Sequence, residues 1–201
     1  MKLSEKIFVA FDTETTGLSP YSHVVEIGAV KFLGNRVIDT FSYLVKPPIP
    51  IPREATRIHG ITNDMVKGRE TFGVVGRRFL RFIEDAILLA HNAPFDLKVL
   101  TVELKRYNLS IPENPVIDTY ELSRSFFPEL PSHSLPYLKK VWKSPFSKSH
   151  RALLDAKNVA YVFLMMLNKW GLVDGNIEDL FSMTKVYRFN QFERSLELKV
   201  S

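Results

Sequence analysis

The chain has 201 residues, of which 45% are hydrophobic and 24% are charged, so its length suits one domain with a well-buried core and its composition excludes a disordered or fibrous protein. The net charge of +5 at pH 7 is by itself only a weak indication of a polyanionic partner. Because the sequence contains no cysteine, disulfides, thiolate metal sites and thiol nucleophiles are excluded, and any metal must be held by oxygen or nitrogen ligands.

The beginning of the chain predicts a strand and no targeting segment. Its start, MKLSEKIFVAF, lacks a signal-type apolar stretch with a small-residue cleavage site, and no apolar run approaches the roughly 18 residues needed to span a bilayer. We therefore expect a cytoplasmic protein without membrane association. Residues Ile7–Phe11 form a continuous apolar run rich in β-formers, which predicts a central strand that is buried on both faces and ends at Asp12.

Two more strands and an extended connection follow. Val24–Leu33 and Arg36–Val45 are strand-like runs, and the Gly34-Asn35 pair between them suits the positive φ angles of a tight hairpin. Four prolines between positions 47 and 52 predict an extended connection, because proline neither donates to a ladder nor continues a helix. The short R-I-H-G-I segment that follows at positions 57–61 is expected to be structured.

The second half of the chain predicts helices that alternate with short strands. Apolar residues at helical spacing indicate a helix from Phe72 to Ile83, and Ile87–Ala90 is a short apolar strand. Another helix begins near Pro94, Val116–Ile117 is a further strand, and a long helix runs from about Ala152 to Leu167. A strand meander followed by alternating helices and strands predicts an α/β fold with a mixed central sheet flanked by helices.

Two carboxylates, Asp12 and Glu14, lie two positions apart where the first strand ends. While the chain stays extended, both point to the same side, and the T-T-G that follows turns the backbone away. This arrangement suits a hard cation and a ligand that approaches the backbone closely. The alternative interpretation is a strand end with solvated acids, which is the commoner meaning of an isolated D-x-E.

Three other residues could join these acids. Asp96 follows a short strand at the start of a helix, where an acid favoured by the helix dipole is the alternative interpretation. Asp155 lies one turn into the last helix among apolar neighbours, where a carboxylate is costly unless it caps the helix, forms a salt bridge or binds a ligand. His150 lies on the loop that enters this helix, although a lone histidine is usually structural or solvated.

The combination of motifs is more specific than any one of them. The sequence contains F-D-x-E-T-T-G-L, H-N-x-x-F-D and H-R-A-L-x-D-A, in that order and over about 145 residues. This set resembles the three motifs of the DEDDh (DnaQ-like) 3′–5′ exonuclease family. Within the family it is most similar to the proofreading exonucleases of bacterial DNA polymerase III, either the separate epsilon-type subunit or the domain inside PolC-type polymerases. The resemblance covers roughly Phe8 to Leu167 and includes the R-I-H-G-I-T segment.

This resemblance implies a ribonuclease-H-like fold and a metal-dependent exonuclease that hydrolyses phosphodiester bonds and releases nucleoside monophosphates. It implies that two divalent ions are held by Asp12, Glu14, Asp96 and Asp155, and that His150 is the general base. An all-carboxylate site suits Mg²⁺ or Mn²⁺, whereas the lack of cysteine and the single nearby histidine disfavour zinc. Two cations can stabilise both the attacking and the departing oxygens, and an imidazole can accept a proton at neutral pH.

The resemblance also implies residues that bind the terminal nucleotide. Thr15 and its neighbouring backbone would contact the 3′ hydroxyl, and Leu18 would wedge against the last base. His59 and Asn92 would line the pocket. Structural roles are the alternatives, since Leu18 could simply pack and Asn92 could simply cap a helix.

A basic and aromatic stretch runs directly into His150. Positions 137–151 contain several lysines and aromatic residues and no acid, with Lys139, Lys140 and Lys143 in its first half. Such a mixture can neutralise phosphates and stack on unpaired bases. Alternatively, the lysines are the solvated face of a short helix whose other side is buried.

Together these features predict an exonuclease domain at residues 1–175 and a C-terminal extension at residues 176–201, which is either a packed element or a docking tail. The expected substrate is a single-stranded or frayed DNA end in proofreading or repair, with a replicative DNA polymerase subunit as a potential partner. An RNA 3′ exonuclease or oligonucleotide scavenger is one alternative, since the acids do not read the 2′ hydroxyl. A polymerase-docking module that binds nucleic acid is another.

Overall fold

The computed structural model describes residues 1–146 and 150–197. Its elements in chain order are η1 (Leu3–Glu5), β1 (Ile7–Thr15), β2 (Val24–Leu33), β3 (Arg36–Leu44), α1 (Arg53–His59), α2 (Asn63–Val66), α3 (Phe72–Phe82), β4 (Ile87–Ala90), α4 (Ala93–Arg106), β5 (Val116–Asp118), α5 (Thr119–Phe126), α6 (Leu135–Val141), α7 (Ala152–Trp170), α8 (Ile177–Met183), β6 (Val186–Tyr187) and α9 (Phe189–Glu197). Among the described residues, no helix has both the length and the apolar character needed to cross a membrane.

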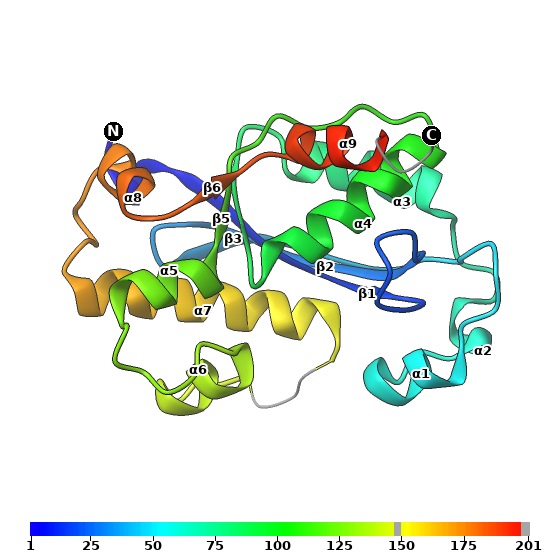
Figure 1. Ribbon diagram of the computed structural model, residues 1–201, viewed down its shortest axis with the longest axis horizontal. Coiled ribbons are helices and arrows are strands. Elements are labelled where there is room, and N and C mark those ends of the chain that lie inside the picture. The colour runs from blue at the N-terminus through cyan, green and yellow to red at the C-terminus, as the bar shows by residue number, and fades with distance from the viewer. Residues whose placement is uncertain (147–149, 198–201) are drawn as a thin grey trace.

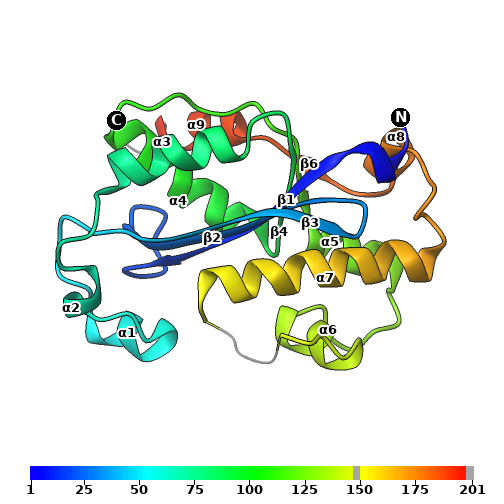
Figure 2. The same cartoon turned by 180° about the vertical axis from the view of Figure 1, so that it is seen from behind.

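The six strands form one mixed sheet in the order β3-β2-β1-β4-β5-β6 (Figure 1). The β1-β2, β2-β3 and β5-β6 pairs are antiparallel, whereas β4 runs parallel to both β1 and β5. Helices α3, α4 and α9 lie on one side of the sheet, and α5 and α7 cover the other side, where α6 packs against α7 (Figures 1 and 2). The predicted α/β architecture of a mixed sheet flanked by helices is confirmed.

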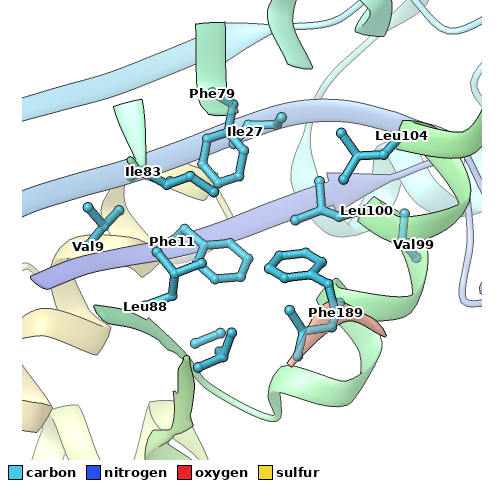
Figure 3. Packing of buried hydrophobic residues seen from close by; sticks show 14 of the residues in the cluster. Val9, Phe11, Ile27, Phe79, Ile83, Leu88, Val99, Leu100, Leu104 and Phe189 are labelled. Carbon is cyan, nitrogen blue, oxygen red and sulfur yellow. The ribbon is translucent and has the colours of Figure 1, made fainter. Parts of the chain in front are cut away.

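Alternate side chains of β1 enter two separate cores. Val9 and Phe11 pack with Phe79 and other buried residues on the side of α3 and α4 (Figure 3). Phe8 and Ala10 pack on the opposite side, in the core that α7 covers. Each large apolar side chain buried in this way stabilises the fold by about 1.5–3 kcal/mol. The strand is therefore fixed from both faces, which gives the polar residues at its far end a defined position.

The first strand is longer than the sequence indicated. We expected it to end at Asp12, but β1 continues to Thr15, so that Asp12 lies opposite Gly28 and Glu14 opposite Glu26. The register shifts only after Glu14. Polar residues continue the strand because β2 supplies backbone partners, and such pairing outweighs a weak intrinsic β-propensity.

Other predicted boundaries agree with the structure. Leu33 pairs with Arg36, which leaves a two-residue hairpin loop in which Gly34 has a φ of 56°. The long helix extends a little beyond the predicted end, to Trp170, and stops at Gly171, whose φ of 75° lies in the left-handed region. Glycine adopts this conformation without the steric cost that a Cβ brings.

The C-terminal extension packs against the rest of the domain wherever it is described. The sequence after Gly175 did not indicate α8 or β6, yet β6 pairs with β5 and α9 lies along α4 (Figure 1). Tyr187, Phe189 and Phe192 belong to the core on that face of the sheet. These aromatic residues are therefore core residues, and residues 198–201 lie outside the described part of the extension.

Helix α7 lies directly against β2 at Gly28. A Cβ added to Gly28 would lie 2.0 Å from the backbone nitrogen of Leu153 and 2.1 Å from the carbonyl carbon of Ala152. Both atoms belong to the first turn of α7, and backbone atoms cannot move aside as the end of a flexible side chain can. The absence of a side chain at Gly28 thus lets the helix that carries Asp155 approach the sheet.

We expect Gly28→Ala to destabilise the protein. The added methyl group forces the first turn of α7 away from β2, and overpacking of this kind costs about 1–3 kcal/mol, which exceeds the entropic gain of about 0.5–1 kcal/mol from replacing glycine in a strand. For a domain of this size the melting temperature should fall by roughly 2–12 °C. A thermal melt that matches the wild type would show that the helix can shift without cost.

Candidate active site

Three carboxylates from distant parts of the chain meet at one end of the sheet. By the alternation of the strand, Asp12 and Glu14 point to the same side of β1 as Phe8, which faces α7. Asp155 lies in the first turn of α7. One carboxylate oxygen from each of the three acids lies within 4.8 Å of those of the other two. The strand and the helix therefore form a group of oxygen ligands that could hold a metal ion.

Asp96 approaches this group from the opposite layer. It lies in the first turn of α4, where its Oδ1 accepts hydrogen bonds from the backbone nitrogen of Thr13 at 3.1 Å and from the Thr13 hydroxyl at 2.6 Å. Thr13 thus fixes Asp96 on one face of β1, while its two neighbours present their acids on the other. Among the neighbouring charges, that of Asp96 raises the pKa of Asp12 the most.

Burial raises the pKa values of all four acids, and repulsion from the other acids of the group adds to it at Asp12 and Glu14. Burial is the larger cause for Asp12, whose pKa lies well above its usual value, and the charges of Asp96 and Glu14 raise it further. Burial, followed by the charge of Asp155, raises the pKa of Glu14 to about 8. Burial also raises the pKa of Asp96 to about 6 and that of Asp155 above its usual value, although hydrogen bonds to these two groups oppose it. A divalent cation would relieve this repulsion, so the donor set fits a hard metal ion.

His150 enters the site through the backbone that precedes α7. Its φ of 60° lies in the left-handed region, and its backbone nitrogen donates a hydrogen bond of 2.6 Å to Oδ2 of Asp155. The His150 side chain is exposed and lines an open cavity of about 540 Å³ together with Asp12, Asp155, Asn92 and Lys139. The structure therefore brings the histidine and two of the acids to one accessible cavity.

His59 holds the end of β1 from the side of α1. It is buried, and its Nδ1 accepts a hydrogen bond from the backbone nitrogen of Ile61 at 3.0 Å. The remaining ring nitrogen, Nε2, therefore carries the hydrogen and donates to the carbonyl oxygen of Thr15 at 3.3 Å. Burial lowers the pKa of His59, which favours this neutral form.

Leu18 and Asn92, which were also expected to bind the terminal nucleotide, do not take the purely structural roles that were their alternatives. Leu18 is 84% exposed on the turn after β1, so it does not simply pack in the core. Asn92 is the residue before α4, with a left-handed φ of 61°, but its side chain makes no capping hydrogen bond. Both residues are therefore exposed, and Asn92 lines the cavity beside Asp12 and Asp155.

The basic stretch divides between a buried and an exposed side. α6 buries Leu138, and Trp142 is also buried directly after it, which agrees with the expectation of a short helix packed on one side. Lys140 and Lys143 are exposed, and Lys139 lines the cavity. Of these three lysines, Lys139 alone lines the cavity that contains Asp12 and Asp155.

Two buried carboxylates that the sequence analysis did not single out position the site. Oδ1 and Oδ2 of Asp118 accept hydrogen bonds from the backbone nitrogens of Asn92 and Ala93, at 2.9 and 3.2 Å, at the start of α4. Glu26 lies opposite Glu14 and binds the start of α7. The signal for Glu26 was present in the sequence, since an acid that follows two valines and precedes Ile27 within a mostly apolar strand needs a partner.

A model of the exonuclease family (RNase_T) matches residues 9–163. The chain belongs to this exonuclease family. The family resemblance inferred from the three motifs is therefore confirmed. Since the match includes β1 through most of α7, the exonuclease segment contains all four acids and the histidine discussed above.

Relatives of this exonuclease include much longer proteins. The DNA polymerase III PolC-type protein of Caldanaerobacter subterraneus subsp. tengcongensis is 41% identical over 163 residues, which are 81% of this chain and 12% of that protein. The protein of the same name from Bacillus subtilis (strain 168) is 40% identical over 167 residues, 82% of this chain and 12% of that protein. The chain thus spans about 12% of the length of these relatives.

Among solved structures, Exonuclease X in complex with 5′ overhanging duplex DNA has a TM-score of 0.67 and 28% sequence identity to this chain. The match covers 86% of this chain and 98% of the Exonuclease X chain. Together with the mixed sheet and its two helical layers, this likeness confirms the expected ribonuclease-H-like fold.

We expect the metal-free protein to lose stability as pH rises from about 5 to 8. Since the pKa of Glu14 is raised from 4.5 to about 8, the folded carboxyl group keeps a proton that the unfolded chain releases above pH 4.5. Its contribution to stability is fully present below pH 4.5 and is lost as pH approaches 8. Melting temperatures measured in chelator should therefore fall over this range, and Glu14→Gln should flatten the decline. A variant that keeps the wild-type slope would contradict this assignment.

Proposed function

We propose that this exonuclease domain is a metal-dependent enzyme that removes nucleotides one at a time from 3′ ends of single-stranded or frayed DNA, in proofreading or repair. The observation that carries the proposal is the group of three carboxylates within 4.8 Å, with raised pKa values, beside a cavity that His150 also lines. The PolC-type names of its relatives support a replicative role, and the DNA bound to Exonuclease X supports DNA as the substrate class.

In this mechanism Asp12, Glu14, Asp96 and Asp155 would hold two divalent ions, Mg²⁺ or Mn²⁺. Such ions, when bound, stabilise the negative charge that develops on the phosphate during an in-line displacement. Asp12 faces the cavity from the rigid strand, Glu14 lies on the same side of that strand, and Thr13 orients Asp96. Asp155 supplies a ligand from α7 and also binds the backbone of His150. The imidazole of His150 accepts the proton of the attacking water.

The neighbouring residues would hold the strand. In our proposal Thr15 contacts the terminal 3′ hydroxyl, and Leu18, which is exposed, stacks against the last base. His59 and Asn92 complete the pocket for the terminal nucleotide. The strand then passes the basic surface formed by Lys139, Lys140 and Lys143, which neutralises its phosphates.

The proposal also includes a division of the chain into a catalytic unit and an extension, a location in the cell and a partner protein. Residues 1–175 form the catalytic unit, and residues 176–201 are an extension whose described part packs against it. We propose that the protein acts in the cytoplasm, with a replicative DNA polymerase subunit as its partner. A preference for RNA cleavage would instead support the RNA exonuclease alternative. Nucleic-acid binding without turnover would support the docking-module alternative.

With Mg²⁺ present, the enzyme should release mononucleotides from the labelled 3′ end of a single-stranded DNA, and chelation should abolish the reaction. Asp155→Asn is the matched control: it should be inactive, yet it should melt in chelator no lower than the wild type, because neutralising one acid relieves repulsion. A strand that keeps its 3′ label while internal fragments accumulate is incompatible with the proposal. Faster cleavage of an RNA of the same sequence would favour the RNA alternative.

His150→Ala should lower kcat by roughly 10²–10⁴-fold, the usual contribution of a general base, with little change in the affinity for the DNA strand. The backbone nitrogen of residue 150 remains able to bind Asp155, so the ligand set should persist. Single-turnover rates and strand binding in Ca²⁺ measure the two quantities separately. A variant that keeps the wild-type rate across neutral pH would remove His150 from the mechanism.

A further inference from the structure

Glu26 makes a set of contacts that neither the family motifs nor the mechanism above uses. Its side chain is 2% exposed, and both carboxylate oxygens are engaged. Nε of Arg151 lies 3.2 Å from Oε1 and 3.1 Å from Oε2, and Nη2 of Arg151 donates to Oε1 at 2.8 Å. The backbone nitrogen of Ala152 donates to Oε2 at 3.0 Å. One buried carboxylate on β2 therefore binds two consecutive residues at the start of α7.

These contacts pair a backbone amide at the start of α7 that has no partner within the helix. The first amides of a helix have no partner inside the helix, and negative charge near that end is favourable. Arg151, which precedes α7, makes no side-chain capping bond to the helix, so the carboxylate of Glu26 takes this role for Ala152. The bidentate contact with Arg151 also offsets the charge of an acid that lies opposite Glu14 in the strand register.

The anchored residues lie within one turn of the functional ones. Asp155 follows Ala152 by three positions, and its carboxylate accepts the backbone hydrogen bond of His150, which directly precedes Arg151. Gly28, two positions along β2 and on the same side, leaves the space that this turn occupies. A small movement of the turn would carry Asp155 and His150 away from β1 together.

We propose that Glu26 is a positioning residue: by holding Arg151 and the amide of Ala152, it sets the start of α7 so that Asp155 and His150 face the acids of β1. This inference rests on the proposed metal-dependent function for its catalytic consequence. Its structural part, the anchoring of the Ala152 amide, is independent of that function. Glu26 acts through α7 and not as a ligand, because both of its oxygens are already bonded to the helix start.

The test compares Glu26→Ala and Glu26→Gln with Glu70→Gln, a control that removes the charge of an exposed carboxylate paired with Arg78. Hydrogen exchange in chelator reports on the anchor without metal or activity. Glu26→Ala should lose the protection of the Ala152 amide, whereas Glu26→Gln should keep part of it, because the amide oxygen can still accept this bond. The control should leave it unchanged.

The same variants then separate positioning from general stability. The Mg²⁺ concentration for half-maximal cleavage should rise roughly 10–100-fold in Glu26→Ala, the usual effect of losing a residue that orients a ligand, while KM for the strand changes less than about threefold. Glu26→Gln should be intermediate. If Glu26→Ala does not fold, the comparison between Glu26→Gln and the wild type decides the outcome.

Each result has a distinct meaning. Unchanged Ala152 protection and an unchanged Mg²⁺ requirement in the Glu26 variants would overturn the inference, as would a lower melting temperature with the wild-type Mg²⁺ requirement. If the wild-type protein itself fails to shorten DNA from its 3′ end, the proposed function is wrong, and the exchange measurement still decides whether Glu26 anchors α7.

Discussion

Like charge gathered at one end of the sheet is the constraint on which the rest of the structure depends. The acids of β1 would repel one another and pull the strand toward solvent if the strand were not fixed along its apolar half. Phe8 provides that anchor, since its ring lies 5.6 Å from Phe32 and 5.1 Å from Phe163 of α7. The same three elements thus form a dry core at one end and an acidic site at the other. Apolar burial in the first half offsets the electrostatic cost of the second.

Both helices that bring an acid to the site begin in the same way. α4 starts with amides bound by Asp118 of β5, and α7 starts with an amide bound by Glu26 of β2. In each case a buried carboxylate on a strand satisfies backbone donors at a helix start, and the acid that we propose as a metal ligand follows within one turn. The sheet therefore supplies two kinds of acid. One kind, represented by Asp12, faces the cavity, and the other fixes the direction of a neighbouring helix.

Much of this arrangement could be predicted from the sequence, because the apolar runs of the central strands and the stripe of α7 are strong local signals. The motifs also predicted which acids belong together. The extension of β1 to Thr15 was missed because Asp12 and Glu14 disfavour a strand and interrupt the apolar run, and this part of the strand depends on pairing with β2. Asp96 was expected among the ligands, but its bond to Thr13 arises from the packing of α4 against β1, which no local pattern reports. The partners of Glu26 were hidden for the same reason, since Arg151 is distant in the sequence.

The wide separation of the site residues along the chain determines when the site can form during synthesis. β1 is synthesised first but lies in the middle of the sheet, between β2 and a strand that arrives much later. Contacts between residues so far apart form slowly and only after the intervening chain is available. Until α7 has emerged, Asp12 and Glu14 have no Asp155 beside them, so a nascent chain carries the first two acids without the third acid of the group. The nuclease activity that we propose therefore requires nearly the whole domain to have been made.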